Sequence, residues 1–249
     1  MPISLKTPDQ VALMRAAGVI VRDVLDYLSG LIVPGMTTAE LDHIGHARIR
    51  QAGAEASFYN YNGFPAALCI SVNEEVIHGI PGPRVIQDGD LVSLDVGVYL
   101  DGYHADAAVT VGVGDISDTG RALIRTAEDC FWAGVVAAVP GGRMGDIAAA
   151  VAATAEANGF AVAREFSGHG IGRRIHEEPD VPNYGRAGSG TILRPGMTFA
   201  LEPMVLQRAS EVIILEDDWT AVTADGGLAA HYEHTLAITP TGVDVLTAG

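Results

Sequence analysis

Cysteine is scarce in this sequence, with only Cys69 and Cys130 among 249 residues. The two cysteines form no CxxC motif, which excludes a disulfide framework and fits a reducing compartment. No uncharged apolar stretch reaches about 18 residues, the length that a membrane-spanning helix needs. The polar N-terminus, MPISLKTPDQ, also lacks the apolar core of a signal peptide. We therefore expect a cytoplasmic protein with no membrane partner.

Basic residues are also scarce. There are 15 Lys and Arg against 31 Asp and Glu, which gives a formal net charge of -16. A chain this acidic repels phosphate backbones, so we expect no nucleic-acid partner. Most of the acidic residues are expected to form a solvated surface, and only their positions can identify ligands among them. The hydrophobic content of 48% is enough for one core, and we predict a single domain over residues 1–249.

An internal repeat organises the chain. Residues 33–53 begin VPG and end AG, and residues 139–159, which lie 106 positions later, begin VPG and end NG. Each copy follows a stretch with helical spacing of apolar residues and enters a second helix after the Pro-Gly break. The two helix-like stretches span residues 7–29 and 118–138. Thr37 or Thr38 is expected to cap the second helix of the first copy.

The repeat extends into strand-like segments. GDLVSLDV resembles GMTFALEP at an offset of 107, and HADAAVTV lies opposite HYEHTLAI at an offset of 127. Asp95 then corresponds to Glu202, and Asp106 corresponds to Glu233. Chance similarity would explain any single match, but three matches in the same order favour a duplication. The predicted halves span approximately residues 7–115 and 118–245.

A β-hairpin is predicted to bring two of these acids together. Strand-like residues 90–99 and 103–112 are joined by Asp-Gly, a strong signal for a two-residue turn. In that register Asp106 lies opposite Gly97. Asp95 is then a diagonal neighbour on the same face, about 7–8 Å away at the backbone. Gly97 is expected to leave open space beside the two carboxylates.

Acids on one face of an apolar strand repel each other and are costly to bury without a counter-ion. The same argument applies to Glu202, between Leu201 and Pro203, and to Glu233, just before an apolar strand. For any one of these acids, a buried salt bridge explains the sequence as well as a metal ion does. No Lys or Arg occurs in the four segments, however, which favours a metal.

The eight histidines fall into three groups. His43 and His46 lie on a predicted helix, where a solvated face is the expected role. A structural role is expected for the three histidines that flank the acids, His104, His231 and His234. The remaining three lie in irregular segments rich in glycine and charge, which makes them site candidates, although a hydrogen-bonded loop histidine is the alternative. These three are His78, His169 and His176.

The motifs resemble those of type I methionine aminopeptidases. The matching segments are SLDVGVYLDGYHADAA (93–108), GHGIGRRIHEEP (168–179), PGMTFALEPM (195–204) and HYEHT (231–235). The resemblance runs from about residue 4 to the end of the chain, and it is closest to the short bacterial form. It implies an α+β "pita-bread" fold, in which two helix pairs related by a pseudo-twofold axis flank a curved antiparallel sheet.

The resemblance also implies a centre of two divalent metal ions, of Co, Mn, Fe, Zn or Ni. Asp95, Asp106 and Glu233 would hold one ion, and the other would be held by Asp106, His169, Glu202 and Glu233. Glu202 would also act as the proton shuttle, and His78 and His176 would contact the substrate. The methionine side chain would lie against Phe58, Tyr61, Phe64, Cys69, Ile175 and Trp219. Phe58 and Ile175 depart from the family pattern, in which a cysteine and a Phe or Met are common.

The implied activity is hydrolytic removal of the initiator methionine, with a small uncharged second residue preferred. Two metal ions would activate the attacking water, and the free α-amine of the substrate would bind at one of them. The expected partner is the N-terminal methionine of a nascent polypeptide, near the ribosome. The protein is expected to act as a monomer.

Three other functions fit parts of the sequence. A related aminopeptidase that cuts Xaa-Pro bonds would share the fold, but such enzymes usually carry an additional N-terminal domain. An iron oxygenase would use His104, Asp106 and His169 as a 2-His-1-carboxylate triad, but it leaves the other three acids unexplained. A binding protein without activity would be expected to have lost ligands, whereas all five are present.

Overall fold

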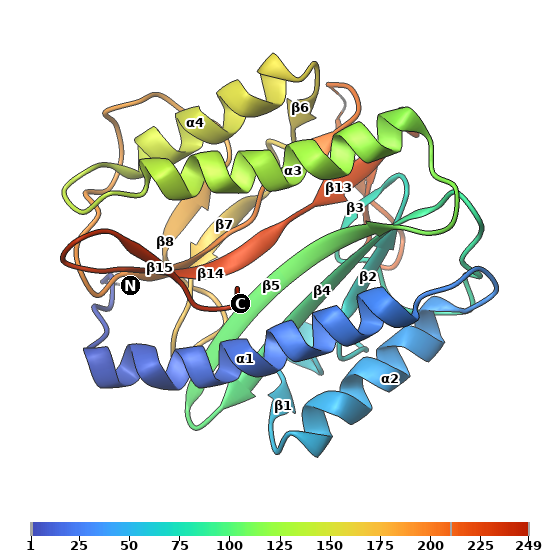
Figure 1. The fold of residues 1–249 in the computed structure, drawn as a ribbon, viewed down its shortest axis with the longest axis horizontal. Coiled ribbons are helices and arrows are strands. Elements are labelled where there is room, and N and C mark those ends of the chain that lie inside the picture. The colour runs from blue at the N-terminus through green and yellow to red at the C-terminus, as the bar shows by residue number, and fades with distance from the viewer. Residues whose placement is uncertain (1, 210, 249) are drawn as a thin grey trace.

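The computed structural model describes residues 2–209 and 211–248 (Figure 1). Its helices are α1 (Pro8–Leu31), α2 (Thr38–Gln51), α3 (Asp118–Ala137) and α4 (Met144–Ala157), with a 3-10 helix at Tyr61–Gly63. Its strands are β1 (Glu55–Ala56), β2 (Cys69–Val72), β3 (Glu75–Ile77), β4 (Leu91–Leu100), β5 (Tyr103–Gly112), β6 (Ala161–Val162), β7 (Ser167–Gly170), β8 (Glu177–Pro182), β9 (Thr198–Leu201), β10 (Met204–Leu206), β11 (Val212–Ile214), β12 (Ala221–Thr223), β13 (Ala229–His231), β14 (Glu233–Ile238) and β15 (Val243–Val245).

The helices begin at the residues that local chemistry favours. Thr7 caps α1 in a reciprocal capping box with Gln10, and Thr37 caps α2 in the same way with Glu40. Of the two threonines considered from the sequence, Thr37 is therefore the cap. Gly53 and Gly159 follow the ends of α2 and α4 with φ values of 78° and 80°, which glycine adopts without steric cost.

The main sheet is antiparallel and runs through the centre of the molecule. Within the described residues its strand order is β1-β4-β5-β14-β9-β7-β8, with β2 added on β4 and β15 on β14. The β4–β5 hairpin has the predicted register, because Gly97 pairs with Asp106 and Asp95 pairs with Ala108. Smaller three-stranded sheets, β13-β10-β6 and β11-β12-β3, flank it.

Both helix pairs cover one face of this sheet (Figure 1). Helices α1 and α2 pack on a row of β4 side chains, Val92, Leu94, Val96 and Val98. Helices α3 and α4 pack on Phe199, Leu201 and Leu236 of the other half. His234 pairs with Ala107, so the two cores lie on the same side of the continuous sheet. Because side chains alternate along a strand, the neighbouring acids project from the opposite face.

The two halves correspond in several backbone details. Gly35 and Gly141 have φ values of 97° and 85°, and an isolated bridge follows each, Thr37 with Val85 and Arg143 with Ile192. The helices α2 and α4 each contain 14 residues. These correspondences support the predicted duplication. The single domain over residues 1–249 stays a prediction.

One sequence-based expectation about the sheet is wrong. A Cβ placed on Gly97 would lie 2.9 Å from the Phe58 ring and 2.9 Å from the Ser57 side chain. The space beside Asp95 and Asp106 is therefore filled by the segment that follows β1, and the glycine is needed for that close approach.

Among the described residues, no helix combines the length and the apolarity that a membrane crossing requires.

Candidate metal centre and substrate cavity

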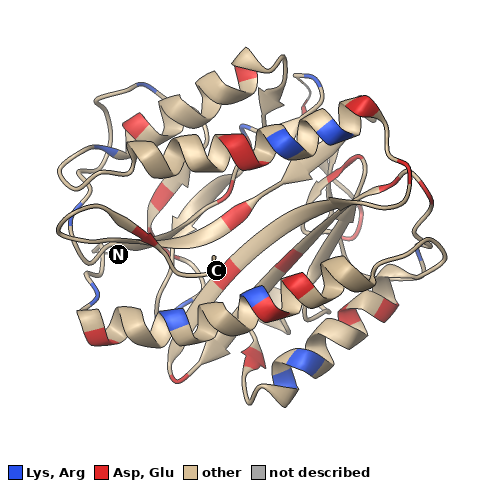
Figure 2. Ribbon diagram, in the orientation of Figure 1, with Lys and Arg blue, Asp and Glu red and all other residues tan. Residues whose placement is uncertain are grey.

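Four buried carboxylates converge on the face of the sheet that carries no helices. We call Asp95, Asp106, Glu202 and Glu233 the acid cluster. Asp95 and Asp106 lie on β4 and β5, Glu233 begins β14, and Glu202 follows β9 directly. Figure 2 shows acidic positions on the central strands, whereas Lys and Arg lie on helices and loops. All four residues are at most 9% exposed.

The acid cluster has no compensating partner within the described residues. Asp95 Oδ1, Asp106 Oδ1, Glu202 Oε1 and Glu233 Oε1 are buried and accept no hydrogen bond. Burial raises the pKa of Asp106 to about 7. Burial, reinforced by repulsion from Asp106, holds the pKa of the other three carboxyls well above their usual range. No Lys or Arg among the described residues lines the cavity, so a bound cation is the fitting counter-charge.

Two groups of side chains have ligand atoms close enough to hold an ion. Asp106, His169 and Glu233 form one group, and Asp95, His231 and Glu233 form the other, with all ligand atoms in a group within 4.8 Å of one another. Glu233 belongs to both groups. Glu202 lies beside the first group, with its Oε1 3.5 Å from His169 Nε2. All five predicted ligands are therefore gathered at one place.

His169 presents one ring nitrogen to the cluster. It lies on strand β7, not in the irregular loop expected from the sequence, because residues 167–170 pair with β8 and β9. Its Nδ1 is 3.0 Å from the carbonyl oxygen of Gly170, an arrangement that places the proton on Nδ1 and leaves Nε2 as the ligand atom. Burial lowers the pKa of His169 to about 3, so the ring is neutral.

The sequence reasoning missed one member of these groups, His231. It was expected to be structural, yet its ring belongs to the Asp95 group and its Nε2 lies 3.4 Å from Glu233 Oε2. The available signal was the spacing His-x-Glu, which places two alternate side chains on one face of an extended chain.

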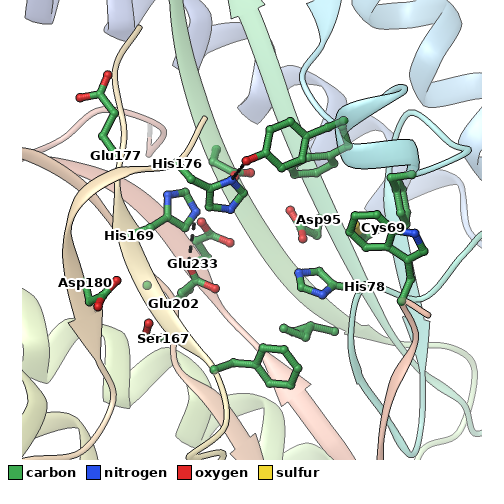
Figure 3. A pocket seen from close by; sticks show the side chains of 18 of the residues that line it. Cys69, His78, Asp95, Ser167, His169, His176, Glu177, Asp180, Glu202 and Glu233 are labelled. Atoms are coloured by element: carbon green, nitrogen blue, oxygen red, sulfur yellow. Dashed lines mark hydrogen bonds and ion pairs between the residues drawn. The ribbon is translucent and has the colours of Figure 1, made fainter. Parts of the chain in front are cut away.

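A cavity of about 500 Å³ opens in front of the acid cluster (Figure 3). One wall is apolar and is formed by Phe58, Tyr61, Phe64, Cys69 and Trp219, with Trp219 packed edge-on against Phe64 at 5.1 Å. Ile175 belongs to the same apolar group but lies behind the wall, because it is 3% exposed and does not line the cavity. Phe166, Glu178 and Asp180 also line the cavity and were not predicted.

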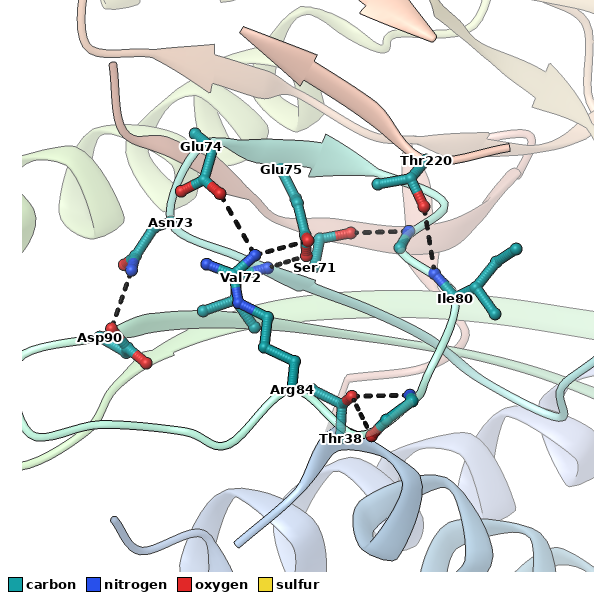
Figure 4. A network of polar contacts seen from close by, with 12 residues as sticks. Thr38, Ser71, Val72, Asn73, Glu74, Glu75, Ile80, Arg84, Asp90 and Thr220 are labelled. Atoms are coloured by element: carbon teal, nitrogen blue, oxygen red, sulfur yellow. Dashed lines mark hydrogen bonds and ion pairs between the residues drawn. The ribbon is translucent and has the colours of Figure 1, made fainter. Parts of the chain in front are cut away.

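His78 enters the cavity from the segment after β3. Its φ of 58° is unusual for a residue with a side chain, and hydrogen bonds from the two residues that follow it hold the backbone (Figure 4). Gly79 N–H donates to Ser71 Oγ at 3.1 Å, and Ile80 N–H donates to Thr220 Oγ1 at 3.4 Å. The ring lies edge-on to Phe166 and Trp219, and burial lowers the pKa of His78 to about 4.

His176 stands at the rim of the cavity. Its Nδ1 is 2.8 Å from the Tyr61 hydroxyl, and its ring lies 4.1 Å from that of His169. The loop that carries it is tied to the N-terminal segment, because buried Lys6 forms an ion pair with Glu177. Partial burial lowers the pKa of His176.

The other histidines lie outside the two candidate ligand groups. His43 is exposed, and His46 stacks on Tyr59. His234 projects from the helix-covered face and is 2.8 Å from Thr247 Oγ1. His104 Nδ1 is 2.8 Å from Ser57 Oγ, so the structure does not assemble the His104, Asp106 and His169 triad of an iron oxygenase.

A carboxylate-rich, partly imidazole centre beside an apolar cavity defines a metal-dependent hydrolase. The model of metallopeptidase family M24 matches residues 12–240 of the chain. This protein belongs to that metallopeptidase family, whose members use divalent metal ions.

Its relatives are similar over their whole length. The methionine aminopeptidase of Clostridium perfringens is 51% identical over 98% of both chains. The crystal structure of the methionine aminopeptidase of Thermotoga maritima superposes with a TM-score of 0.97 over 100% of both chains, at 41% identity. These relatives confirm the pita-bread fold. The prolidase of Pyrococcus furiosus has a TM-score of 0.79 at 23% identity, with 98% of this chain and 65% of that one covered, and it shares the fold alone.

Proposed function

We propose that this protein is a methionine aminopeptidase, which hydrolyses the first peptide bond of polypeptides that begin with methionine. The observation that carries the proposal is the acid cluster with its orphaned oxygens, placed beside a wall of apolar side chains. The full-length relatives named methionine aminopeptidases support it. The initiator methionine of nascent chains, followed by a small uncharged residue, is the proposed physiological substrate.

The acid cluster and His169 fit a centre of two divalent ions. Asp95, Asp106 and Glu233 would hold one ion, and the other would be held by Asp106, His169, Glu202 and Glu233. Co, Mn, Fe, Zn and Ni all accept carboxylate and imidazole ligands, so the metal supplied by the cell would decide which is bound. When bound, such a pair of ions lowers the pKa of water and polarises the carbonyl to be attacked.

Glu202 is the proposed proton carrier. Its Oε1 is buried without a hydrogen-bond partner among the described residues. With metal ions holding the acid cluster deprotonated, the Glu202 carboxylate would take a proton from the attacking water and deliver it to the departing amine.

The two cavity histidines are proposed to position the substrate. If the Tyr61 hydroxyl donates to His176 Nδ1, the proton of that ring lies on Nε2, which then donates to the carbonyl oxygen as negative charge develops there. His78 would contact the amide being cleaved or its neighbour. Its lowered pKa keeps the ring neutral, so it adds no positive charge beside the proposed metal ions.

The apolar wall suits a thioether. Phe58, Phe64 and Trp219 provide aromatic surfaces, against which a methionine sulfur packs favourably. A free α-amine in its neutral form has a lone pair that can bind at the metal centre, and no Lys or Arg among the described residues lines the cavity. A substrate with a free N-terminus would therefore bind with its side chain on the wall and its amine at the acid cluster.

The direct test is release of methionine from Met-Ala-Ser by protein loaded with Co²⁺ or Mn²⁺. Cleavage of Met-Ala-Ser, with acetyl-Met-Ala-Ser left intact, is expected. Comparison with Ala-Pro-Ser separates the proposed activity from that of an Xaa-Pro aminopeptidase. Faster release of alanine from Ala-Pro-Ser than of methionine from Met-Ala-Ser would overturn the proposal.

A further inference from the structure

A buried histidine outside the predicted ligand set faces the Asp95 side of the acid cluster. His231 is 2% exposed, and its Nε2 has no hydrogen-bond partner among the described residues. That nitrogen and the carboxylate oxygens of Asp95 and Glu233 lie within 4.8 Å of one another. An imidazole nitrogen buried without a hydrogen-bond partner destabilises the fold. The neighbouring carboxylates of Asp95 and Glu233 are acceptors, and one ring nitrogen cannot donate to both of them.

The backbone holds this ring in place. His231 N–H donates to Thr110 Oγ1 at 2.8 Å, and the Thr110 hydroxyl donates back to the His231 carbonyl oxygen at 2.8 Å. Ser93 Oγ lies 2.7 Å from Thr110 Oγ1, so its hydroxyl donates to it and β4 joins the same network. Met204 pairs with His231 on its other side. The backbone that carries the ring is therefore fixed by contacts to β5 and β10, with β4 linked through Ser93.

We propose that His231 is a sixth metal ligand and gives the ion at Asp95 and Glu233 a nitrogen donor. This inference rests on the proposed metal centre but not on the identity of the substrate. Each candidate ion group then contains one imidazole, His169 in one and His231 in the other. Without His231, the Asp95 group would offer carboxylate oxygens alone.

The consequence is a change in metal preference. Oxygen-only groups suit Mn²⁺, whereas imidazole suits Zn²⁺, Co²⁺ and Ni²⁺. A nitrogen donor at the Asp95 group should therefore strengthen binding of Zn²⁺ and Co²⁺ more than binding of Mn²⁺. Loss of a residue that only hydrogen-bonds to a metal ligand lowers metal affinity about 10–100-fold. Loss of a direct ligand should therefore lower the affinity for the ion at least about tenfold.

His104 offers a matched control. It stands two residues before Asp106, as His231 stands two residues before Glu233, but its ring bonds Ser57 and belongs to neither ligand group. The variants His231→Gln and His104→Gln change the same residue type at the same sequence spacing from an acid.

The experiment titrates metal-free protein with Zn²⁺ and with Mn²⁺ in a calorimeter, without substrate. His231→Gln should lower the affinity of one site for Zn²⁺ at least about tenfold and change that for Mn²⁺ far less, whereas His104→Gln should leave both unchanged. Equal losses for the two metals, or no loss, would overturn the inference. Because no peptide is present, failure of the proposed peptidase activity would leave these results interpretable.

A measurement on the unaltered protein guards against a variant that does not fold. Co²⁺ shifts the ring N–H proton of a directly bound histidine far outside the normal proton NMR range. Two equivalents of Co²⁺ should produce two such signals, one each from His169 and His231. A single signal at saturation would mean that His231 is not a ligand.

Discussion

Asp95 and Glu233 lie on strands that are not neighbours, yet both pair with the same residue. Asp95 pairs with Ala108 across the β4–β5 ladder, and Glu233 pairs with Ala108 across the β5–β14 ladder. Paired residues point to the same face of a sheet, so the side chain of Ala108 lies between the two carboxylates on that face. Because this side chain is a single methyl group, it leaves room between the carboxylates for an ion.

Ala108→Leu should weaken metal binding by filling that gap. The added carbons enter a fully buried position, where overpacking costs about 1–3 kcal/mol. We expect metal affinity, measured by calorimetry, to fall at least about tenfold, which corresponds to 1.4 kcal/mol. Ala108→Gly is the control, because it keeps the gap open. Equal losses in both variants, or none in Ala108→Leu, would contradict the role given to Ala108.

Glu202→Gln should abolish most of the turnover without removing the oxygen donor. Gln keeps a carbonyl oxygen near His169 Nε2 but cannot carry a proton, and general acid–base catalysis contributes about 10²–10⁴-fold. We expect kcat for Met-Ala-Ser to fall by at least about 10²-fold while metal is still bound. Asp180→Asn, on the cavity rim, should retain activity. Full turnover of Glu202→Gln would exclude the proposed proton carrier.

Tyr61→Phe should slow the reaction by releasing His176. The substitution removes the hydroxyl that lies 2.8 Å from His176 Nδ1 but keeps the aromatic wall. A hydrogen bond of about 1 kcal/mol corresponds to roughly a fivefold change, which we expect mainly in kcat rather than in KM. Tyr59→Phe, at an exposed position, should have no effect. A change confined to KM would mean that Tyr61 acts only as part of the methionine wall.

The stability of the metal-free protein should fall as pH rises through about 7. Burial raises the pKa of Asp106 to about 7 and that of the other three carboxyls of the acid cluster further. The folded state thus holds protons that the unfolded state, with carboxyl pKa values near 4, has released. Raising the pH through the folded-state pKa values removes them and leaves buried, mutually repelling charges.

Buried histidines oppose this trend at lower pH. Burial lowers the pKa of His169 and of His231 to about 3, so below about 6.5 the unfolded state takes up protons that the folded state does not. Thermal midpoints of chelator-treated protein should therefore fall more steeply with pH above about 6.5 than below it. Metal-loaded protein should lack the alkaline loss, because the ion holds the carboxylates deprotonated. Identical pH slopes with and without metal would contradict this account.

Local chemistry made much of the site predictable. The Asp101-Gly102 turn fixed the register of the hairpin, and the register placed Asp95 and Asp106 as diagonal neighbours. The helical spacing of apolar residues predicted the ends of the two longest helices to within two residues. The resemblance then supplied the order of the ligands, which the structure gathers at one place.

What escaped prediction depends on contacts between distant segments. Phe58 fills the space above Gly97, and no periodicity in either strand indicates that approach. His231 faces Asp95 only because β14 joins β5, and the same spacing at His104 leads to Ser57 instead. Ile175 lies behind the wall, in a buried cluster with residues from distant segments such as Met14 and Leu246.

The acid cluster combines residues from both halves of the chain. Glu233, which belongs to both candidate ligand groups, lies on β14, near the C-terminal end. During synthesis, therefore, the first half alone would present Asp95 and Asp106 without the residues that complete either group. Metal capture must wait until the ribosome has released almost the whole chain. The ion would accordingly bind after the sheet has formed and would not nucleate folding.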